Sequence, residues 1–104
     1  MATGNRPIAV NPTTGELTYD GDNLQVAEGS NAKMGTATLN GTTAVVVSTT
    51  AVAANSRIFL TIQAPGGTPA SPYVSARSAG TSFSIKSTGA SDTSTVAWLI
   101  VDPA

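Results

Sequence analysis

Apolar and polar residues alternate in short runs along most of the chain, from about residue 34 onward. In the run 82–87, Phe83 and Ile85 alternate with polar residues, which places both on the inward face of a strand. Turn residues separate the runs at intervals typical of a β-sandwich or barrel. We therefore predict an all-β fold, a small antiparallel β-sandwich or jelly-roll-like barrel, with strands at 36–40, 43–49, 57–63, 73–77, 82–87 and 95–101.

The last of these runs differs from the others because residues 96–101 are all apolar. A strand that is apolar on both faces is buried on both, so it is either central in its sheet or covered on one face by another subunit. The dipeptide Asn40-Gly41 is the strongest hairpin signal in the chain, and it predicts that the runs on its two sides pair with each other.

Residues 1–33 predict an extended N-terminal arm, followed by a sandwich body at 34–104. Apolar residues are sparse in the arm except in two short patches, 8–10 and 17–19, and Pro12 and Gly15 favour a turn between them. A short hairpin is expected there, although two strands alone are marginally stable in water. The apolar side chains of the arm are its candidate partner-binding residues: Ile8, Val10, Leu17 and Tyr19.

Charge is scarce and unevenly distributed. Charged residues make up 11% of the chain, against about 25% in an average domain, and the net charge of −1 gives no electrostatic footprint for nucleic acid. The segment up to Glu28 carries a net charge of −3, whereas the remainder carries +2. The acidic excess predicts either a soluble tail or an arm that docks on a basic partner.

The residue types that usually carry catalysis are missing. The chain has no histidine and no cysteine, which removes the usual nucleophile activation and metal ligands. Four of the six carboxylates lie in the predicted arm, where nothing rigid would position them. The acidic turn 20–23 lacks the Gly and Glu that a calcium loop needs at its sixth and twelfth positions. We therefore expect no enzyme activity, no catalytic residue, no metal and no cofactor.

Targeting features are also missing. The first residues lack the basic and apolar regions of a signal peptide, and no apolar run approaches the ~20 residues of a membrane span. The absence of cysteine favours folding in a reducing cytoplasm. Among the aromatic residues, Phe83 and Trp98 are expected in the core, whereas Tyr19, Phe59 and Tyr73 are the better candidates for an interface.

Several segments of the body resemble a module that recurs in tailed-bacteriophage and prophage structural proteins. The resemblance extends over roughly two thirds of the chain and is most specific in the closing segment; the matching stretches are 54–61, 65–68, 74–77, 79–83 and 92–101. Similar modules form trimeric end domains of fibre proteins. A short arm without a shaft is more similar to a capsid decoration, or cement, protein.

The resemblance implies a homotrimeric virion structural protein on the capsid surface, with the major capsid protein and other copies of the chain as partners. The alternative is a head- or tail-fibre module that contacts a host receptor or glycan. A third possibility is a free-standing carbohydrate-binding or other adhesion domain. Neither nucleic acid nor membrane is an expected partner.

Overall fold

The computed structural model describes residues 8–10, 13–14, 17–19 and 25–103. Every regular element in this part of the chain is a β-strand, as the alternation of apolar and polar residues predicted. The bounds of the strands are β1 Ile8–Val10, β2 Leu17–Tyr19, β3 Met34–Thr38, β4 Val45–Ser48, β5 Arg57–Ala64, β6 Pro72–Ser78, β7 Ser82–Ser87 and β8 Thr95–Val101.

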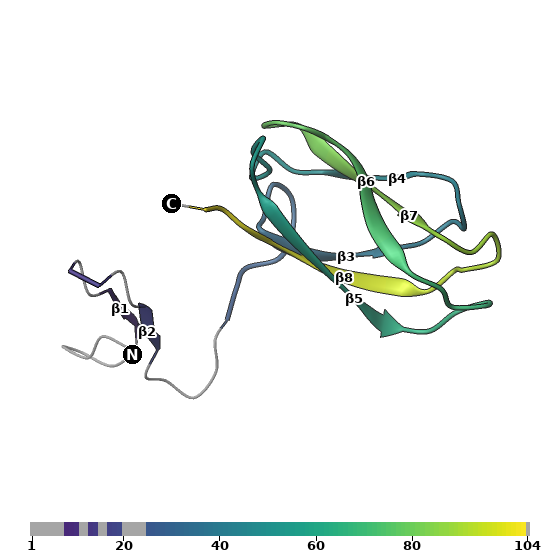
Figure 1. The fold of residues 1–104 in the computed structure, drawn as a ribbon, viewed down its shortest axis with the longest axis horizontal. Coiled ribbons are helices and arrows are strands. Elements are labelled where there is room, and N and C mark those ends of the chain that lie inside the picture. The colour runs from purple at the N-terminus through teal and green to yellow at the C-terminus, as the bar shows by residue number, and fades with distance from the viewer. Residues whose placement is uncertain (1–7, 11–12, 15–16, 20–24, 104) are drawn as a thin grey trace.

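Strands β3 to β8 form two three-stranded antiparallel sheets, in the orders β3-β8-β5 and β4-β7-β6 (Figure 1). The two sheets pack face to face, so the predicted small β-sandwich is confirmed. Strand β8 lies at the centre of its sheet, with β3 and β5 on its two sides. The inward residues of β8, Val96, Trp98 and Ile100, are buried against the other sheet, whereas Ala97 and Leu99 on its outer face are half-buried.

The core consists of side chains from the facing surfaces of the two sheets. Phe83 and Ile85 of β7 are fully buried, as the alternation predicted, and they meet the inward residues of β8. Trp98 is 5% exposed and its ring lies edge-on to Phe83, with 5.3 Å between the ring centroids. Burying each such side chain stabilises the fold by about 1.5–3 kcal/mol. The remaining core residues are Leu39, Val52, Val96 and Ile100.

The hairpin predicted at Asn40-Gly41 is wrong, although the turn itself is present. Gly41 has a positive φ of 59°, and the Thr43 N–H donates to the Asn40 carbonyl at 3.0 Å. The strands on either side, however, belong to different sheets. The Gly41 N–H donates to the Asp92 carbonyl, and its own carbonyl accepts from the Ser87 N–H, both at 2.9 Å. These long-range bonds direct the chain across the sandwich.

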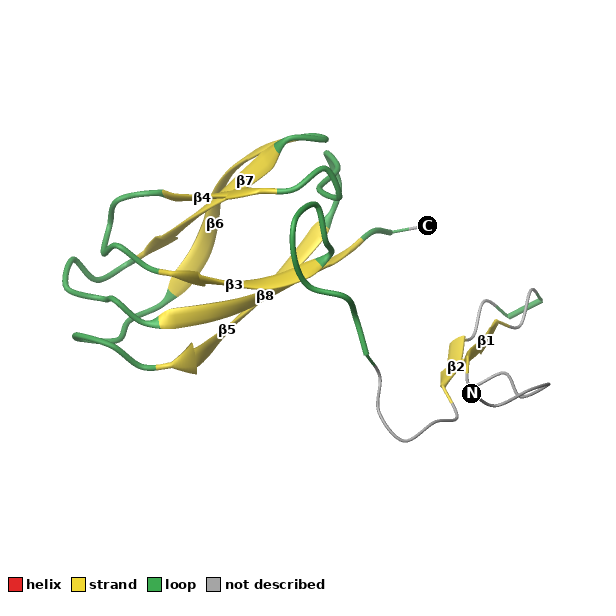
Figure 2. Cartoon of the chain, turned by 180° about the vertical axis from the view of Figure 1, so that it is seen from behind, coloured by secondary structure: helices red, strands yellow, loops and turns green. Residues whose placement is uncertain are grey.

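Strands β1 and β2 pair antiparallel and lie apart from the two sheets (Figures 1 and 2). The segment that leads into β3 is attached to the sandwich by hydrogen bonds. The Lys33 carbonyl accepts from the Ile100 N–H at 2.7 Å, and the Ala32 carbonyl accepts from the Thr49 hydroxyl at 2.7 Å. The position of the boundary between arm and body stays a prediction.

Candidate binding sites

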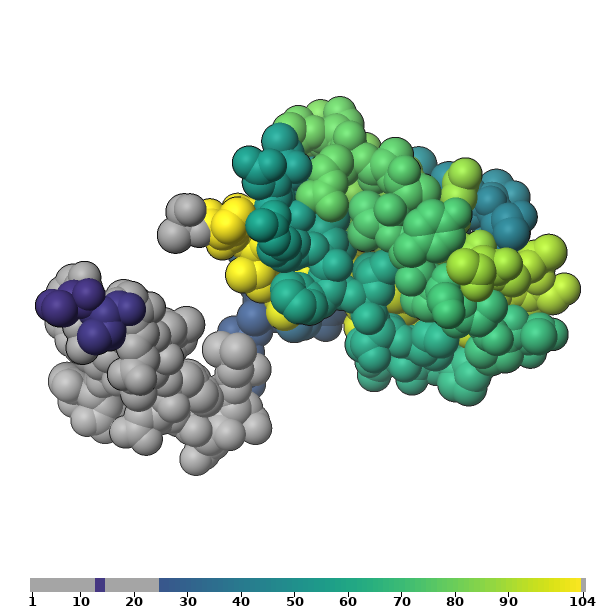
Figure 3. All heavy atoms as spheres, viewed as in Figure 1, coloured from purple at the N-terminus to yellow at the C-terminus, as the bar shows by residue number. Residues whose placement is uncertain are grey.

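The sandwich has two ends with different chemistry. Strands β3, β5 and β7 run in one direction between these ends and β4, β6 and β8 run in the other, so each end collects loops that are far apart in the sequence. We call the end formed by residues 39–44, 65–71 and 88–94 the closed end. We call the other, formed by residues 49–57, 77–81 and 102–103, the arginine end; it lies nearest the C-terminus in Figure 3.

The closed end is organised around Asp92, whose side chain is fully buried. Its carboxylate accepts hydrogen bonds from the Ser87 hydroxyl at 2.6 Å, from the Ser94 N–H at 3.0 Å and from the Ala70 N–H at 3.0 Å. These bonds, led by the one from Ser87, hold the pKa of Asp92 far below its ordinary value in spite of burial. The carboxylate is therefore ionised, saturated and closed off from solvent, which fits a role in holding loops together.

The arginine end exposes two cations. The Arg57 guanidinium donates to the Asn55 carbonyl at 2.6 Å, and the Arg77 guanidinium donates to the Ser56 carbonyl at 2.5 Å. Both side chains are exposed, and neither pairs with a carboxylate among the residues that the structure describes. A depression of about 410 Å³ lies between them, lined by residues 54–59 and by Arg77.

The loop below these arginines is held in place by Ser56, which is 2% exposed. Its hydroxyl accepts from the Ala53 N–H at 2.8 Å and donates to the Asp102 carboxylate. Asp102 follows the end of β8. This contact therefore connects the loop before β5 to the end of β8, the strand that pairs with β5. The carbonyl oxygens that receive the two guanidinium groups are thereby fixed in position.

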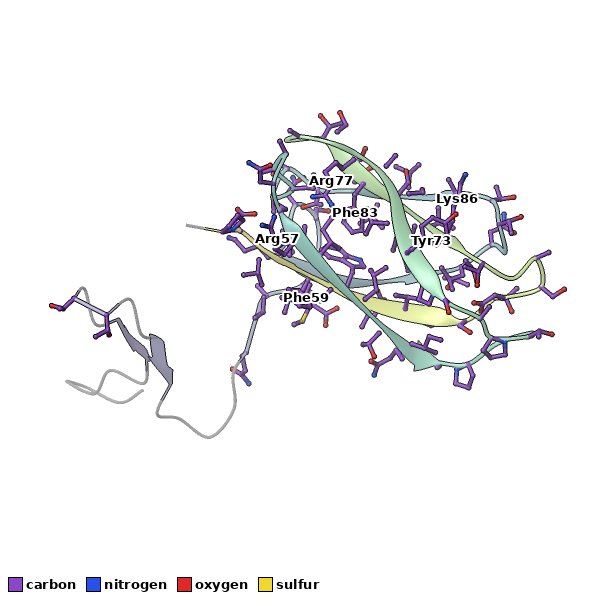
Figure 4. All side chains as sticks on the ribbon, in the orientation of Figure 1. Arg57, Phe59, Tyr73, Arg77, Phe83 and Lys86 are labelled. Atoms are coloured by element: carbon purple, nitrogen blue, oxygen red, sulfur yellow. The ribbon has the colours of Figure 1, made fainter. Side chains whose placement is uncertain are left out.

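Phe59 extends the arginine end toward the outer face of the β3-β8-β5 sheet. It is 59% exposed and lies two residues after Arg57, on the same side of β5. Figure 4 shows Arg77, Arg57 and Phe59 in succession along this part of the sandwich. The register places Phe59 opposite Leu99, which is opposite Met34 on the other side, so an apolar row crosses the sheet.

The exposed aromatic residues agree with the sequence prediction, because Phe59 and Tyr73 lie on the surface while Phe83 and Trp98 are buried. Tyr73 lies on the outer face of the other sheet, opposite Lys86 of β7. Sequence reasoning missed the site that Arg57 and Arg77 form, because twenty positions separate the two residues. The positive charge of the body was the one signal that pointed to such a site.

The four residues predicted to bind a partner lie on the short hairpin of the arm. The register places Ile8 opposite Tyr19 and Val10 opposite Leu17. The side chains of these four residues lie outside the part of the chain that the structure describes. Their binding role stays a prediction.

Two further properties concern the described residues alone. Among them, no group of three or more His, Cys, Asp or Glu side chains is arranged to hold a metal ion. They also include no helix of the length and hydropathy that a membrane crossing requires.

A compact β-sandwich with one saturated end and one exposed cationic end is typical of structural and binding modules. Residues 31–101 match the family model for the C-terminal domain of K1 capsule-specific polysaccharide lyase. The match extends over more than half of the chain, so the chain belongs to this family. No curated protein and no solved structure matched the chain.

The family supports part of what the resemblance implied. The lyase is a phage tail-spike protein, so the chain is a phage virion module in the broad sense. The match favours the alternative of a fibre or spike module over capsid decoration, which was the leading expectation from the sequence.

Proposed function

We propose that this chain is a non-catalytic module of a phage tail spike or tail fibre, and that it contacts a polysaccharide on the host surface. The observation that carries the proposal is the match of residues 31–101 to the C-terminal domain of a capsule-specific polysaccharide lyase. The exposed cationic end of the sandwich adds to it, because a binding module needs polar groups that the fold itself does not use.

The composition and the described carboxylates support the absence of catalysis. Acid–base and nucleophilic chemistry require positioned groups with adjusted pKa values. The chain has no histidine or cysteine to serve in this way. Its fully buried carboxylate, Asp92, is saturated by hydrogen bonds, and Asp102 accepts one from Ser56.

We also propose that the body assembles as a homotrimer. The outer face of the β3-β8-β5 sheet supports this proposal, because a closed cyclic assembly would cover its apolar residues Leu99 and Met34 and leave Phe59, on the edge strand β5, at the rim of the interface. The trimer, rather than another closed oligomer, follows from the resemblance to fibre end domains. Light scattering on the purified protein tests the assembly, and a monomer mass at micromolar concentration would contradict it.

The test of the main proposal is adsorption. Purified protein is added to host cells before virions that carry the chain, and it should reduce adsorption in proportion to its concentration. The same protein, fluorescently labelled, should bind encapsulated cells and lose binding after enzymatic removal of the capsule. Capsid decoration predicts the opposite pattern: no effect on adsorption, many copies per virion, and heads that rupture at lower temperature when the chain is missing.

A further inference from the structure

We propose that Arg57, Arg77 and Phe59 form a binding site for a saccharide that carries a carboxylate, such as a hexuronic acid unit. The inference deepens the proposed function and rests on it for its biological role. It names the class of sugar and the residues that recognise it, neither of which the family description specifies.

The two guanidinium groups provide the recognition of charge. A guanidinium presents five N–H donors in a planar fork that matches a carboxylate with two parallel hydrogen bonds. Each of the two arginines directs its Nη1 to a main-chain carbonyl, which orients the side chain and leaves its other donors available. Because these contacts restrict both side chains before a ligand arrives, less conformational entropy is lost on binding.

The electrostatic surroundings favour an anion. From Gly29 onward the chain carries four cationic residues against two carboxylates. One of these carboxylates, Asp92, is buried at the closed end. The other, Asp102, accepts a hydrogen bond from Ser56 and lines a separate depression beside the same loop. The depression between the arginines is lined by no carboxylate, so both of the charged side chains that line it are cationic.

Phe59 distinguishes a sugar from a simple anion. An exposed aromatic ring beside a polar site offers a flat apolar surface, which suits the C–H face of a pyranose ring. The apolar residues that line the depression are Ala54, Ile58 and Phe59, and its volume of about 410 Å³ is within the range of small-molecule sites. Carboxylate recognition by the arginines and stacking on Phe59 together fit a single acidic sugar unit with its neighbours extending into solvent.

An acidic protein segment is the competing occupant. The chain carries Glu16, Asp20, Asp22 and Glu28 in its own N-terminal part, and such a segment also complements two arginines. The flat exposed ring of Phe59 beside the cations suits the C–H face of a pyranose better than it suits the acidic side chains of a peptide. We therefore favour the saccharide, and a synthetic peptide of residues 16–28 serves as the competing probe.

The experiment is a calorimetric titration of the full chain with two oligosaccharides of equal length, one containing glucuronate and the other containing glucose. The glucuronate form should bind at least about tenfold more tightly, since a hydrogen-bonded charge pair contributes that much to affinity. Arg57→Gln should remove this preference, Arg57→Lys should restore part of it, and Phe59→Ala should weaken binding to both sugars. Rising salt should weaken the glucuronate form selectively.

Controls separate the site from general charge. Lys86→Gln removes one cation from the other sheet and should leave binding unchanged, and thermal unfolding verifies that each variant is folded. Arg77 also donates a hydrogen bond to the Ser56 carbonyl, so Arg77→Gln removes both a cation and this contact. Arg77→Lys, which keeps the positive charge, is therefore measured beside it. Equal binding of the two sugars, an equal loss in Lys86→Gln, or binding of the 16–28 peptide without binding of glucuronate would each overturn the proposal.

The two proposals fail in different ways. If labelled Arg57→Gln protein still binds encapsulated cells as well as the wild type does, the site is wrong while the host-contacting function stands. If the wild type binds the glucuronate oligosaccharide but no host cell, the site stands and the proposed function is wrong.

Discussion

The two ends of the sandwich use polar residues in opposite ways. At the closed end, the hydroxyl, carboxylate and main-chain groups around Asp92 bond to one another and are withdrawn from solvent. At the arginine end, Arg57 and Arg77 donate to main-chain carbonyls and keep further donors exposed. One end therefore secures the fold, whereas the other leaves hydrogen-bond donors exposed to solvent.

Burial explains why the closed end has so many internal hydrogen bonds. A carboxylate in a dry environment is costly unless donors surround it. Among the residues that the structure describes, no cation pairs with Asp92, and the Ser87 hydroxyl and two main-chain N–H groups take the place of one. Further bonds join the same loops, including Gly66 N–H to the Ser94 hydroxyl at 3.1 Å. Losing the Asp92 carboxylate would leave the three donors that converge on it without this acceptor.

The largest expected effect is that of Asp92→Ala. This change leaves the Ser87 hydroxyl and two N–H groups buried without an acceptor, so it should lower the midpoint of thermal unfolding more than any change at the arginine end. Circular dichroism measures the midpoint. The matched control is Asp102→Ala, which removes the acceptor of Ser56 and should have a smaller effect. Equal effects at the two ends would contradict the comparison.

The Asp92→Asn variant tests the stabilising role of the Asp92 charge through the pH dependence of the unfolding free energy. Whichever way the amide is oriented, its NH₂ faces an N–H donor, so the variant is less stable at neutral pH. The folded-state pKa of Asp92 is depressed, so its charge stabilises the protein above about pH 4, and this contribution falls as the pH decreases toward the folded-state pKa. Urea unfolding should show a difference between wild type and variant that is constant above about pH 5 and shrinks in acid. A difference that grows in acid would refute this role.

Two glycines, one at each end, provide a matched pair with the next largest effect. Gly41 and Gly80 have positive φ values of 59° and 71°, so alanine is strained at both by roughly 1–2 kcal/mol. A Cβ at Gly41 would lie 2.2 Å from the Ala90 carbonyl oxygen, whereas a Cβ at Gly80 would have nothing within 4 Å. Gly41→Ala should therefore lose about 1–3 kcal/mol more unfolding free energy than Gly80→Ala. Denaturant titration measures both; similar losses would mean that the closed end is less tightly packed than the structure indicates.

The smallest effect on stability belongs to Arg57→Gln. Its side chain is exposed and donates a hydrogen bond to one main-chain carbonyl, so the free energy of unfolding should change by less than about 0.5 kcal/mol. The variant should nevertheless lose its preference for an acidic saccharide. A large loss of stability would place Arg57 among the residues that secure the fold and remove the contrast between the two ends.

The local pattern of the sequence determined the strands and their inward faces. The six strands of the sandwich lie where alternation and turn residues predicted them, within a few residues, because a period of two and the conformational limits of turns are local properties. Phe83 and Ile85 were identified as core residues from this alternation, and Trp98 from the apolar residues on both sides of it.

Only the tertiary structure decided which strands pair and which polar groups meet. The turn at Gly41 is present, yet its neighbours enter different sheets because Gly41 bonds to Ser87 and Asp92, residues more than forty positions away. Arg57 and Arg77 become neighbours because β5 and β6 form adjacent edges of the two sheets. Such contacts depend on the packing of distant segments, and a pattern that repeats every two residues carries no information about them.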